Sequence, residues 1–291
     1  MSKKASAFFM AVLTAVMTVS VPAAEVVDTG LLMLINAEHK VDEEFNPERV
    51  RVEDTYFYMR EEAAKSLYEM LNIMERELGE APMIISTYRS YEKQEDVFNT
   101  DINKALRSGK TREEALEQTS KYIQIPGGSE HQSALAVDLS NDGSLEENFI
   151  ETKAGVWLNE NSHKYGFIIR YPDGKEEYTK INYEPWHIRY VGHPYSDIIH
   201  EKGWCLEEFI EYMKRSPKMV WEDARDVWYI YFVREMPKAV DENTTVSDTN
   251  SEGYIVTTRE AKNSIIVIDK SRNNVVNVLN GRIINRITAD K

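Results

Sequence analysis

Three candidate metal ligands and one further carboxylate have the types and spacing needed for metal-dependent hydrolysis. His131 follows a glycine turn and lies seven residues before Asp138, and His187 lies three residues after Glu184. Two imidazoles and one carboxylate can bind Zn²⁺ and leave a fourth position open for water, which is the arrangement of a catalytic site. The ion lowers the pKa of that water, and a nearby carboxylate can accept its proton. Glu184 is the candidate for this general base.

Spacing alone leaves this site a hypothesis, because a histidine in a strand is more often a packed core residue than a metal ligand. The single cysteine, Cys205, excludes an intramolecular disulfide and a thiolate metal cluster. We interpret it as a small buried residue. Any zinc site must therefore be built from histidines and carboxylates. The other four histidines are assigned no role: His39, His163, His193 and His200.

The bulk composition removes one class of function. The formal net charge is −14, whereas a nucleic-acid partner requires a positive face that releases counterions. With 42% hydrophobic and 29% charged residues, the chain has the composition of a globular protein. Its 291 residues are enough for one hydrophobic core and a smaller additional module.

One strand that carries the candidate residues can be regular, whereas the other must be bent or bulged. In the segment 134–139, Leu135 and Val137 alternate with Asp138, so the carboxylate points away from the apolar face. Glu184 and His187 are three residues apart, and in a regular strand they would face opposite sides. A shared site therefore requires a bend or bulge, which the intervening Pro185 can provide.

The remaining elements indicate an α+β fold, with a small, mainly antiparallel sheet flanked by helices around a zinc cleft, and a β-rich C-terminal appendage. Strands and helices follow one another without strict βαβ alternation, which disfavours a doubly wound sheet. Apolar spacing predicts helices over 58–78, 91–106, 111–117, 152–165 and 207–214, and strands over 82–90, 134–139, 166–170, 186–191 and 227–233.

These elements suggest four regions. Residues 1–24 resemble a secretory signal, with two lysines, an apolar run and small residues before the first acid. A membrane anchor is the alternative, since roughly 17 apolar residues are the lower limit for crossing a bilayer. A lead-in of unassigned role follows at 25–54, in which Leu31–Ile35 is a possible strand. We expect a catalytic domain at 55–215 and a β-rich region at 216–291, with a polar linker at 241–252 and a hairpin turn at Asn280-Gly281.

Three sequence strings then resemble the motifs of the VanY-type D-alanyl-D-alanine carboxypeptidases, which share the Hedgehog/D,D-peptidase-like fold. The order and spacing of the strings also match, and the similarity covers roughly residues 55 to 215. The strings are Tyr88-Arg89-Ser90-Tyr91-Glu92-Lys93-Gln94, Ser129-Glu130-His131 through Asp138, and Glu184-Pro185-Trp186-His187-Ile188-Arg189-Tyr190-Val191-Gly192.

The resemblance implies a role for each matching residue. It implies that His131, Asp138 and His187 bind one catalytic Zn²⁺ and that Glu184 is the general base. Arg89, Gln94 and Ser129 would contact the substrate, and Arg89 would bind its carboxylate or stabilise the oxyanion. The implied substrates are peptidoglycan stem peptides ending in D-Ala-D-Ala, and the implied location is the cell wall, the extracellular space or the outer face of the cytoplasmic membrane of a bacterium, with a possible tether through the N-terminal segment.

One departure and three alternatives accompany this reading. The family pattern has glycine three residues after the first histidine, where this chain has Ala134, and we expect a small local shift there. A D,D-dipeptidase and a cell-wall endopeptidase are alternatives on the same scaffold. A noncatalytic, zinc-containing wall-binding module is disfavoured by Glu184, because a structural zinc site needs no base. The sequence leaves open the oligomeric state, the role of the C-terminal region and any link to glycopeptide resistance.

Overall fold

The computed structural model describes residues 26–262, 264–269, 274–279 and 282–288. The predicted signal or anchor at 1–24 and the predicted turn at Asn280-Gly281 lie outside these residues. Among the residues that are described, no helix is both long and apolar enough to cross a bilayer.

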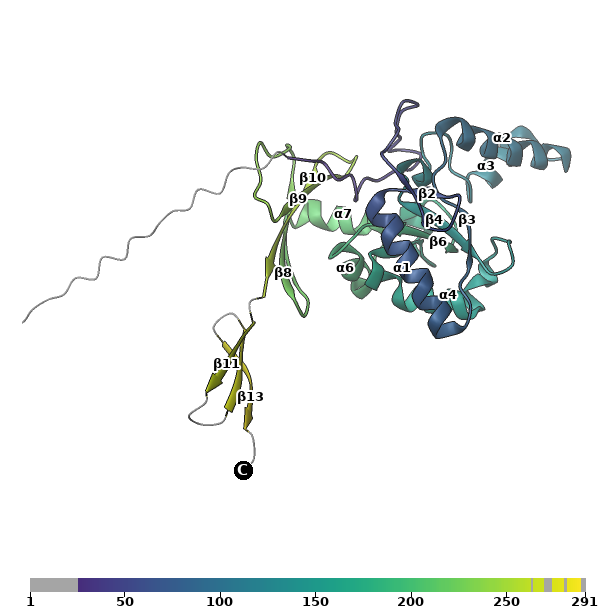
Figure 1. The fold of residues 1–291 in the computed structure, drawn as a ribbon. Coiled ribbons are helices and arrows are strands. Elements are labelled where there is room, and N and C mark those ends of the chain that lie inside the picture. Colours follow the sequence, from purple (N-terminus) through teal and green to yellow (C-terminus); the bar gives the residue numbers. More distant parts are fainter. Residues whose placement is uncertain (1–25, 263, 270–273, 280–281, 289–291) are drawn as a thin grey trace, which may run out of the picture.

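A four-stranded antiparallel sheet forms the centre of the region predicted as the catalytic domain, residues 55–215 (Figure 1). Its strands are β3 (Met83–Ser86), β4 (Ala136–Ser140), β5 (Phe167–Tyr171) and β6 (Glu184–Tyr190), and their spatial order is β3-β4-β6-β5. Helices flank this sheet, so the predicted α+β class is confirmed.

The hydrophobic core lies between this sheet and helices α1 (Glu61–Leu78) and α4 (Lys153–Asn161). Leu67, Met70 and Met74 recur along one side of α1 and are fully buried. Leu135 and Val137 belong to the same core, whereas Asp138 does not. The alternation in the sequence therefore correctly predicted which way β4 faces.

Two further helices, α2 (Tyr91–Arg107) and α3 (Arg112–Thr119), pack against each other beyond β3. Ser90 caps α2 by accepting a hydrogen bond from the Lys93 amide. Thr111 and Glu114 form a capping box at the start of α3. The Ser90 cap fixes the start of α2 at Tyr91, two residues after Arg89, and thereby positions one wall of the cleft described below.

Short elements complete the domain. The helix predicted from residue 58 begins at Glu61, because Tyr58–Met59 pair with Val50–Arg51 as a two-stranded ribbon. The helix predicted over 152–165 is α4 followed by a 3₁₀ turn. These elements are β1 (Val50–Arg51), β2 (Tyr58–Met59), η1 (Glu130–Ser133), η2 (Glu147–Glu151), η3 (Ser162–Tyr165), α5 (Glu176–Thr179), α6 (Tyr195–Lys202) and α7 (Leu206–Arg215).

The C-terminal part is rich in strands, as predicted, but residues 241–252 are not simply a linker. Thr244–Asp248 form strand β9, which pairs along β10 (Tyr254–Ala261). Threonine and valine suit a half-buried strand, and Val246 supplies the buried contact. The first C-terminal sheet has the order β7-β8-β10-β9, with β7 at Lys218–Glu222 and β8 at Asp226–Val233. A second sheet contains β11 (Ser264–Asp269), β12 (Asn274–Leu279) and β13 (Arg282–Thr288).

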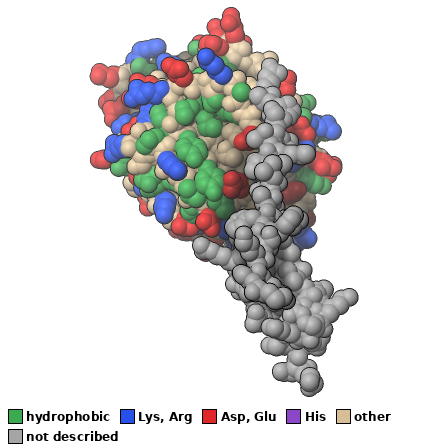
Figure 2. Space-filling model, turned by 90° about the vertical axis from the view of Figure 1, so that its left-hand side faces the viewer, with side chains coloured by type: hydrophobic (Ala, Val, Ile, Leu, Met, Phe, Trp, Pro, Cys, Tyr) green, Lys and Arg blue, Asp and Glu red, His purple; other side chains and the backbone are tan. Residues whose placement is uncertain are grey.

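The two faces of the β7–β10 sheet differ. Ile230 and Ile255 are buried in one hydrophobic cluster with Phe209 and Met213 of α7. On the other face, Val220 is 47% exposed. Figure 2 views the molecule from this side and shows hydrophobic side chains gathered among charged ones.

Leu31–Ile35 could be a first strand or part of the lead-in by its sequence, and the structure shows no strand there. The segment begins with a turn at Leu31 and Leu32, and it is apolar because Leu32, Leu34 and Ile35 are buried between the predicted catalytic domain and the β7–β10 sheet (Figure 1). Its backbone hydrogen bonds go to β9 and to the turn after it: Leu32 N donates to Ser247 Oγ, and Leu34 N donates to the Thr249 carbonyl. The lead-in thus links the first C-terminal sheet to the catalytic domain.

Candidate active site

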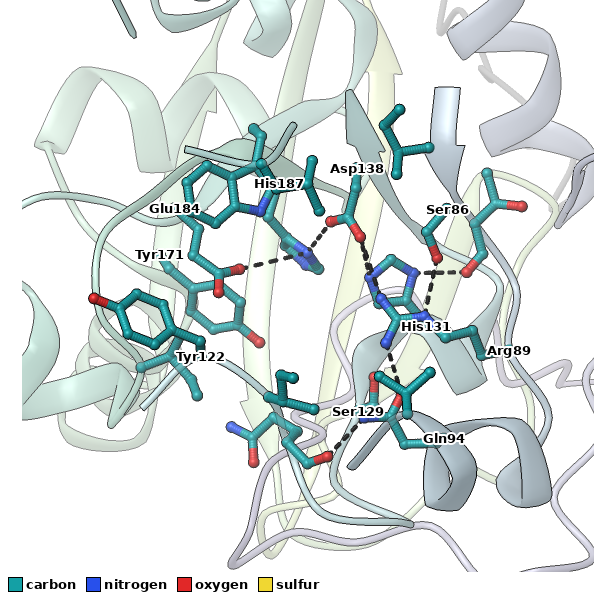
Figure 3. A pocket seen from close by; sticks show the side chains of 18 of the residues that line it. Ser86, Arg89, Gln94, Tyr122, Ser129, His131, Asp138, Tyr171, Glu184 and His187 are labelled. Carbon is teal, nitrogen blue, oxygen red and sulfur yellow. Dashed lines mark hydrogen bonds and ion pairs between the residues drawn. The ribbon is translucent and has the colours of Figure 1, made fainter. Parts of the chain in front are cut away.

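All seven residues proposed from the sequence line one cleft with a volume of about 1060 Å³. The cleft lies on the catalytic domain and includes residues of η1, β4, β6 and α2. Figure 3 shows that the side chains converge from these separate elements. The set consists of Arg89, Gln94, Ser129, His131, Asp138, Glu184 and His187.

Two of the three candidate ligands lie opposite each other on neighbouring strands. Asp138 of β4 is in register with His187 of β6, and His131 lies in η1, just before β4. Asp138 Oδ1 is 2.8 Å from His187 Nδ1, and Asp138 Oδ2 is 3.1 Å from His131 Nε2. One ligand atom from each residue lies within 4.8 Å of the others, and all three side chains are buried. This group can bind a metal ion.

The hydrogen bonds around the imidazoles assign their nitrogens. His131 Nδ1 lies 2.6 Å from the Thr87 carbonyl oxygen and donates to it, so its Nε2 lone pair faces Asp138. His187 presents Nδ1 to Asp138 instead. Two imidazole nitrogens and a carboxylate oxygen therefore lie within 4.8 Å of one another, and divalent transition metals such as Zn²⁺ prefer this donor set.

Glu184 reaches the same site through an irregularity in β6. Ile188 pairs with Ile169, but Glu184 pairs with Tyr171, so β6 has two residues more than β5 over this stretch. The predicted bulge is therefore present, and it lets Glu184 and His187 face one cleft. Glu184 Oε2 lies 3.9 Å from His187 Nδ1.

The buried carboxyl and imidazoles have altered proton affinities in the metal-free site. Burial raises the pKa of Glu184 to about 8 and lowers the pKa of His131 to about 4. Burial also opposes the charge of His187, but its interactions with Asp138, Glu130 and Glu184 together outweigh this and raise the pKa of His187 to about 9. A proton therefore stands on His187 where a metal would bind.

Arg89 lies beside this group and is held by three side chains. Its guanidinium donates to Asp138 Oδ2 at 3.2 Å, to Gln94 Oε1 at 2.8 Å and to Ser86 Oγ at 2.9 Å. Gln94 is fully buried, and its amide nitrogen donates to the Gln124 carbonyl. Both ends of the Gln94 amide are therefore engaged within the protein, so Gln94 orients Arg89.

Ala134 occupies the left-handed conformation that the family glycine would favour. Its φ is 59° at the end of η1, and the residue is fully buried. Its carbonyl still accepts a hydrogen bond from the Arg60 amide, and its own amide donates to the His131 carbonyl. The backbone turn that orients His131 is thus preserved with a methyl group in place.

Sequence reasoning missed two residues, Tyr171 and Glu130, that lie against His187. Tyr171 packs its ring 4.9 Å from that of His187. Glu130, inside the Ser-Glu-His string, is buried between Arg170 and Arg189. Although burial opposes its charge, these guanidinium groups hold the pKa of Glu130 below its ordinary value. The position of Glu130 directly before the candidate ligand His131 was the only sequence signal for a role at the site. Its arginine partners lie 40 or more residues away, so no local pattern predicted the ion pairs.

Comparisons with known proteins agree with this geometry. The family model described as VanY, D-alanyl-D-alanine carboxypeptidase, matches residues 56–193. The chain is 36% identical over 198 residues to the putative carboxypeptidase YodJ of Bacillus subtilis. The aligned region covers 64% of this chain and 69% of that protein.

Two solved structures share the fold. The vancomycin-resistance D,D-dipeptidase VanXYg, in complex with a D-Ala-D-Ala phosphinate analogue, matches with a TM-score of 0.66 and 29% identity, covering 79% of this chain and 94% of that one. A zinc-bound variant of the vancomycin-resistance D,D-pentapeptidase VanY matches with a TM-score of 0.55 and 32% identity, covering 62% of this chain and 98% of that one. The chain is therefore a hydrolase that belongs to the VanY family of D-alanyl-D-alanine carboxypeptidases.

Proposed function

We propose that the protein is a zinc-dependent D,D-carboxypeptidase that removes the terminal D-alanine from peptidoglycan stem peptides ending in D-Ala-D-Ala. The observation that carries the proposal is the buried His131, Asp138 and His187 group, with Glu184 bulged into the same cleft. A structural zinc site would need no carboxylate beside an open position.

The ligand atoms would be His131 Nε2, an Asp138 oxygen and His187 Nδ1. Zn²⁺ bound there would lower the pKa of a water molecule and polarise the scissile carbonyl. Glu184 then accepts the proton of the attacking water and delivers it to the leaving amine of D-alanine. Its high pKa in the metal-free site falls when a cation is adjacent, since a nearby positive charge favours the carboxylate.

The substrate contacts divide between Arg89 and Ser129. Because Arg89 donates to Asp138, its guanidinium lies next to the metal position, where negative charge develops on the attacked carbonyl oxygen. Ser129 lines the cleft and can donate its hydroxyl to the free carboxylate of the terminal residue. Gln94 keeps the guanidinium of Arg89 in place.

The size of the cleft favours a longer peptide over a dipeptide. At about 1060 Å³ it lies at the upper end of the range for pockets that hold drug-sized ligands. Its lining continues to Lys104 of α2, Gln118 of α3 and Tyr122. A dipeptide would leave much of this surface without contacts, so we favour carboxypeptidase activity. Dipeptidase activity is the second candidate, because the similar VanXYg carries that name.

The location follows as part of the same proposal. A substrate in the cell wall requires the enzyme to reach the outer side of the cytoplasmic membrane, and residues 1–24 have the composition of an export signal. We propose export, with the same segment as a tether if it is not cleaved.

Mass-resolved digestion of a muramyl pentapeptide tests the function. We expect loss of one D-alanine, complete inhibition by a chelator and recovery with Zn²⁺. Free D-Ala-D-Ala should be cleaved slowly, and a tetrapeptide whose penultimate residue is an L-amino acid reports the stereochemical preference. An unchanged pentapeptide, with zinc bound to the protein, would refute the proposal. Faster cleavage of the dipeptide would favour the second candidate.

A further inference from the structure

Glu130 is the most completely buried carboxylate near the cleft, with 1% of its surface exposed. Its Oε1 lies 2.7 Å from Arg170 Nε and 2.7 Å from Arg189 Nη1. Both arginine residues are themselves fully buried. Burying charged groups is costly even when they are paired, and apolar residues could fill the same volume. The presence of this charged cluster beside the candidate ligands suggests a role beyond packing.

The second oxygen of Glu130 points to such a role. Within the described part of the chain, neither Glu130 Oε2 nor His187 Nε2 has a hydrogen-bond partner. These two buried atoms lie 3.9 Å apart. The other nitrogen of His187 already faces Asp138 at 2.8 Å. His187 therefore stands between two carboxylates, one on each side of its ring.

We infer that Glu130 is a positioning residue that accepts a hydrogen bond from His187 Nε2–H and thereby holds Nδ1 toward the metal. This inference rests on the proposed metal site. Histidine ligands commonly donate their second N–H to a carboxylate, which fixes the tautomer and the orientation of the ring. A shift of about 1 Å brings the two atoms from 3.9 Å to hydrogen-bond distance.

The arginine residues keep Glu130 from turning away. Arg170 binds Glu207 of α7 through two hydrogen bonds, at 2.9 and 2.6 Å. Arg189 donates to the carbonyl oxygens of Leu31 and Met33 in the lead-in, at 3.0 and 3.2 Å. Oε1 is therefore fixed by groups anchored in two other parts of the molecule, and Oε2 is left directed at His187.

Glu130→Gln tests the inference. The amide oxygen can still accept from Arg170 and lie against Arg189, but the NH₂ group then faces an N–H donor on His187. We expect the zinc dissociation constant to rise by about 10- to 100-fold, as measured by competition with a chelator. Glu207→Gln is the matched control, because it weakens the same arginine cluster without touching His187. It should lower thermal stability while the zinc affinity stays within about twofold.

A measurement on the wild-type protein provides a test that does not depend on the folding of a variant. In the zinc-loaded protein, ¹⁵N NMR of labelled histidines should show His187 protonated at Nε2 and bound to metal through Nδ1, with the Nε2–H proton shielded from exchange. Metal bound through Nε2 would overturn the inference, and so would unchanged zinc affinity in Glu130→Gln. A wild-type protein that binds no zinc would instead refute the proposed function.

Discussion

Replacing Glu184 with glutamine should abolish turnover and yet make the metal-free protein more stable. Glu184 is 5% exposed, and its pKa of about 8 means that burial disfavours its charged form. Glutamine has nearly the same shape and carries no charge. The same substitution therefore removes the proton acceptor that catalysis needs and a charge that the fold accommodates poorly.

The size of the effect follows from the altered proton affinity. The rise of the Glu184 pKa from 4.5 to about 8 lowers the free energy of unfolding. At high pH, where the carboxyl is ionised in both the folded and the unfolded protein, the loss is about 5 kcal/mol, at about 1.4 kcal/mol per pKa unit. At pH 7 the folded protein still holds the proton, and the cost is about 3 kcal/mol. An imperfectly paired buried amide costs about 1 kcal/mol. The net gain at pH 7 is therefore about 2 kcal/mol.

The pH dependence gives the sign of the effect. Below pH 4.5 the carboxyl is protonated in both the folded and unfolded states, so Glu184→Gln gains nothing from removing charge. Between pH 4.5 and about pH 8 the unfolded wild-type chain releases the proton first, so wild-type stability falls relative to the variant. Zinc should shrink the difference, because the ion stabilises the ionised carboxylate.

Urea unfolding at pH 5, 7 and 8.5, with a chelator present, measures the difference directly. Glu160→Gln, an exposed position on α4, serves as the control and should show no comparable dependence on pH. A gap between Glu184→Gln and wild type that is constant or that narrows as pH rises would refute the electrostatic reasoning. Retained turnover in Glu184→Gln would refute its role as the base.

Three other predictions concern the same site. Zinc affinity should rise by at least about tenfold per pH unit up to about pH 8, because the ion must displace the proton of His187 and also favours loss of the Glu184 proton; a flat profile in calorimetric titrations would contradict this. Arg89→Lys should lower kcat by about 100-fold with a smaller change in KM, because a single ammonium group cannot replace a planar guanidinium that hydrogen-bonds to three side chains. A change confined to KM would indicate that Arg89 binds the substrate carboxylate instead. Ala134→Gly should change the free energy of unfolding by less than about 1 kcal/mol, since relief of the left-handed conformation, about 1–2 kcal/mol, is offset by lost methyl burial and greater chain entropy; a loss above 2 kcal/mol by urea unfolding would show that packing dominates.

Local patterns predicted most of the catalytic domain because its elements carry their own signals. Helical spacing located α1, and alternation oriented β4 so that Asp138 faces away from the core. The odd spacing of Glu184 and His187 even predicted the bulge in β6. In each case the information lies within a few neighbouring residues.

Features that depend on distant partners were not predictable in this way. Leu31–Ile35 has the apolar composition of a strand, but its hydrogen-bond partners lie more than 200 residues away. Thr244–Asp248 has the polar composition of a linker, yet it becomes a strand because β10 pairs with it. Glu130 acquires its surroundings from Arg170, 40 residues later. No pattern within a short window contains these relationships.

The lead-in has a consequence for the order in which the molecule folds. Its hydrogen bonds to Ser247 and Val246 join residues 215 and 217 positions apart, so they can form only after residue 247 has been synthesised. Until then the carbonyl groups of Leu31 and Met33, which receive Arg189, belong to a segment without its final partners. A chain that stops before residue 244 would lack this closing step. The β7–β10 sheet therefore determines when the lead-in is fixed in place. Only then are the carbonyl groups that hold Arg189, and through it Glu130, in their final positions.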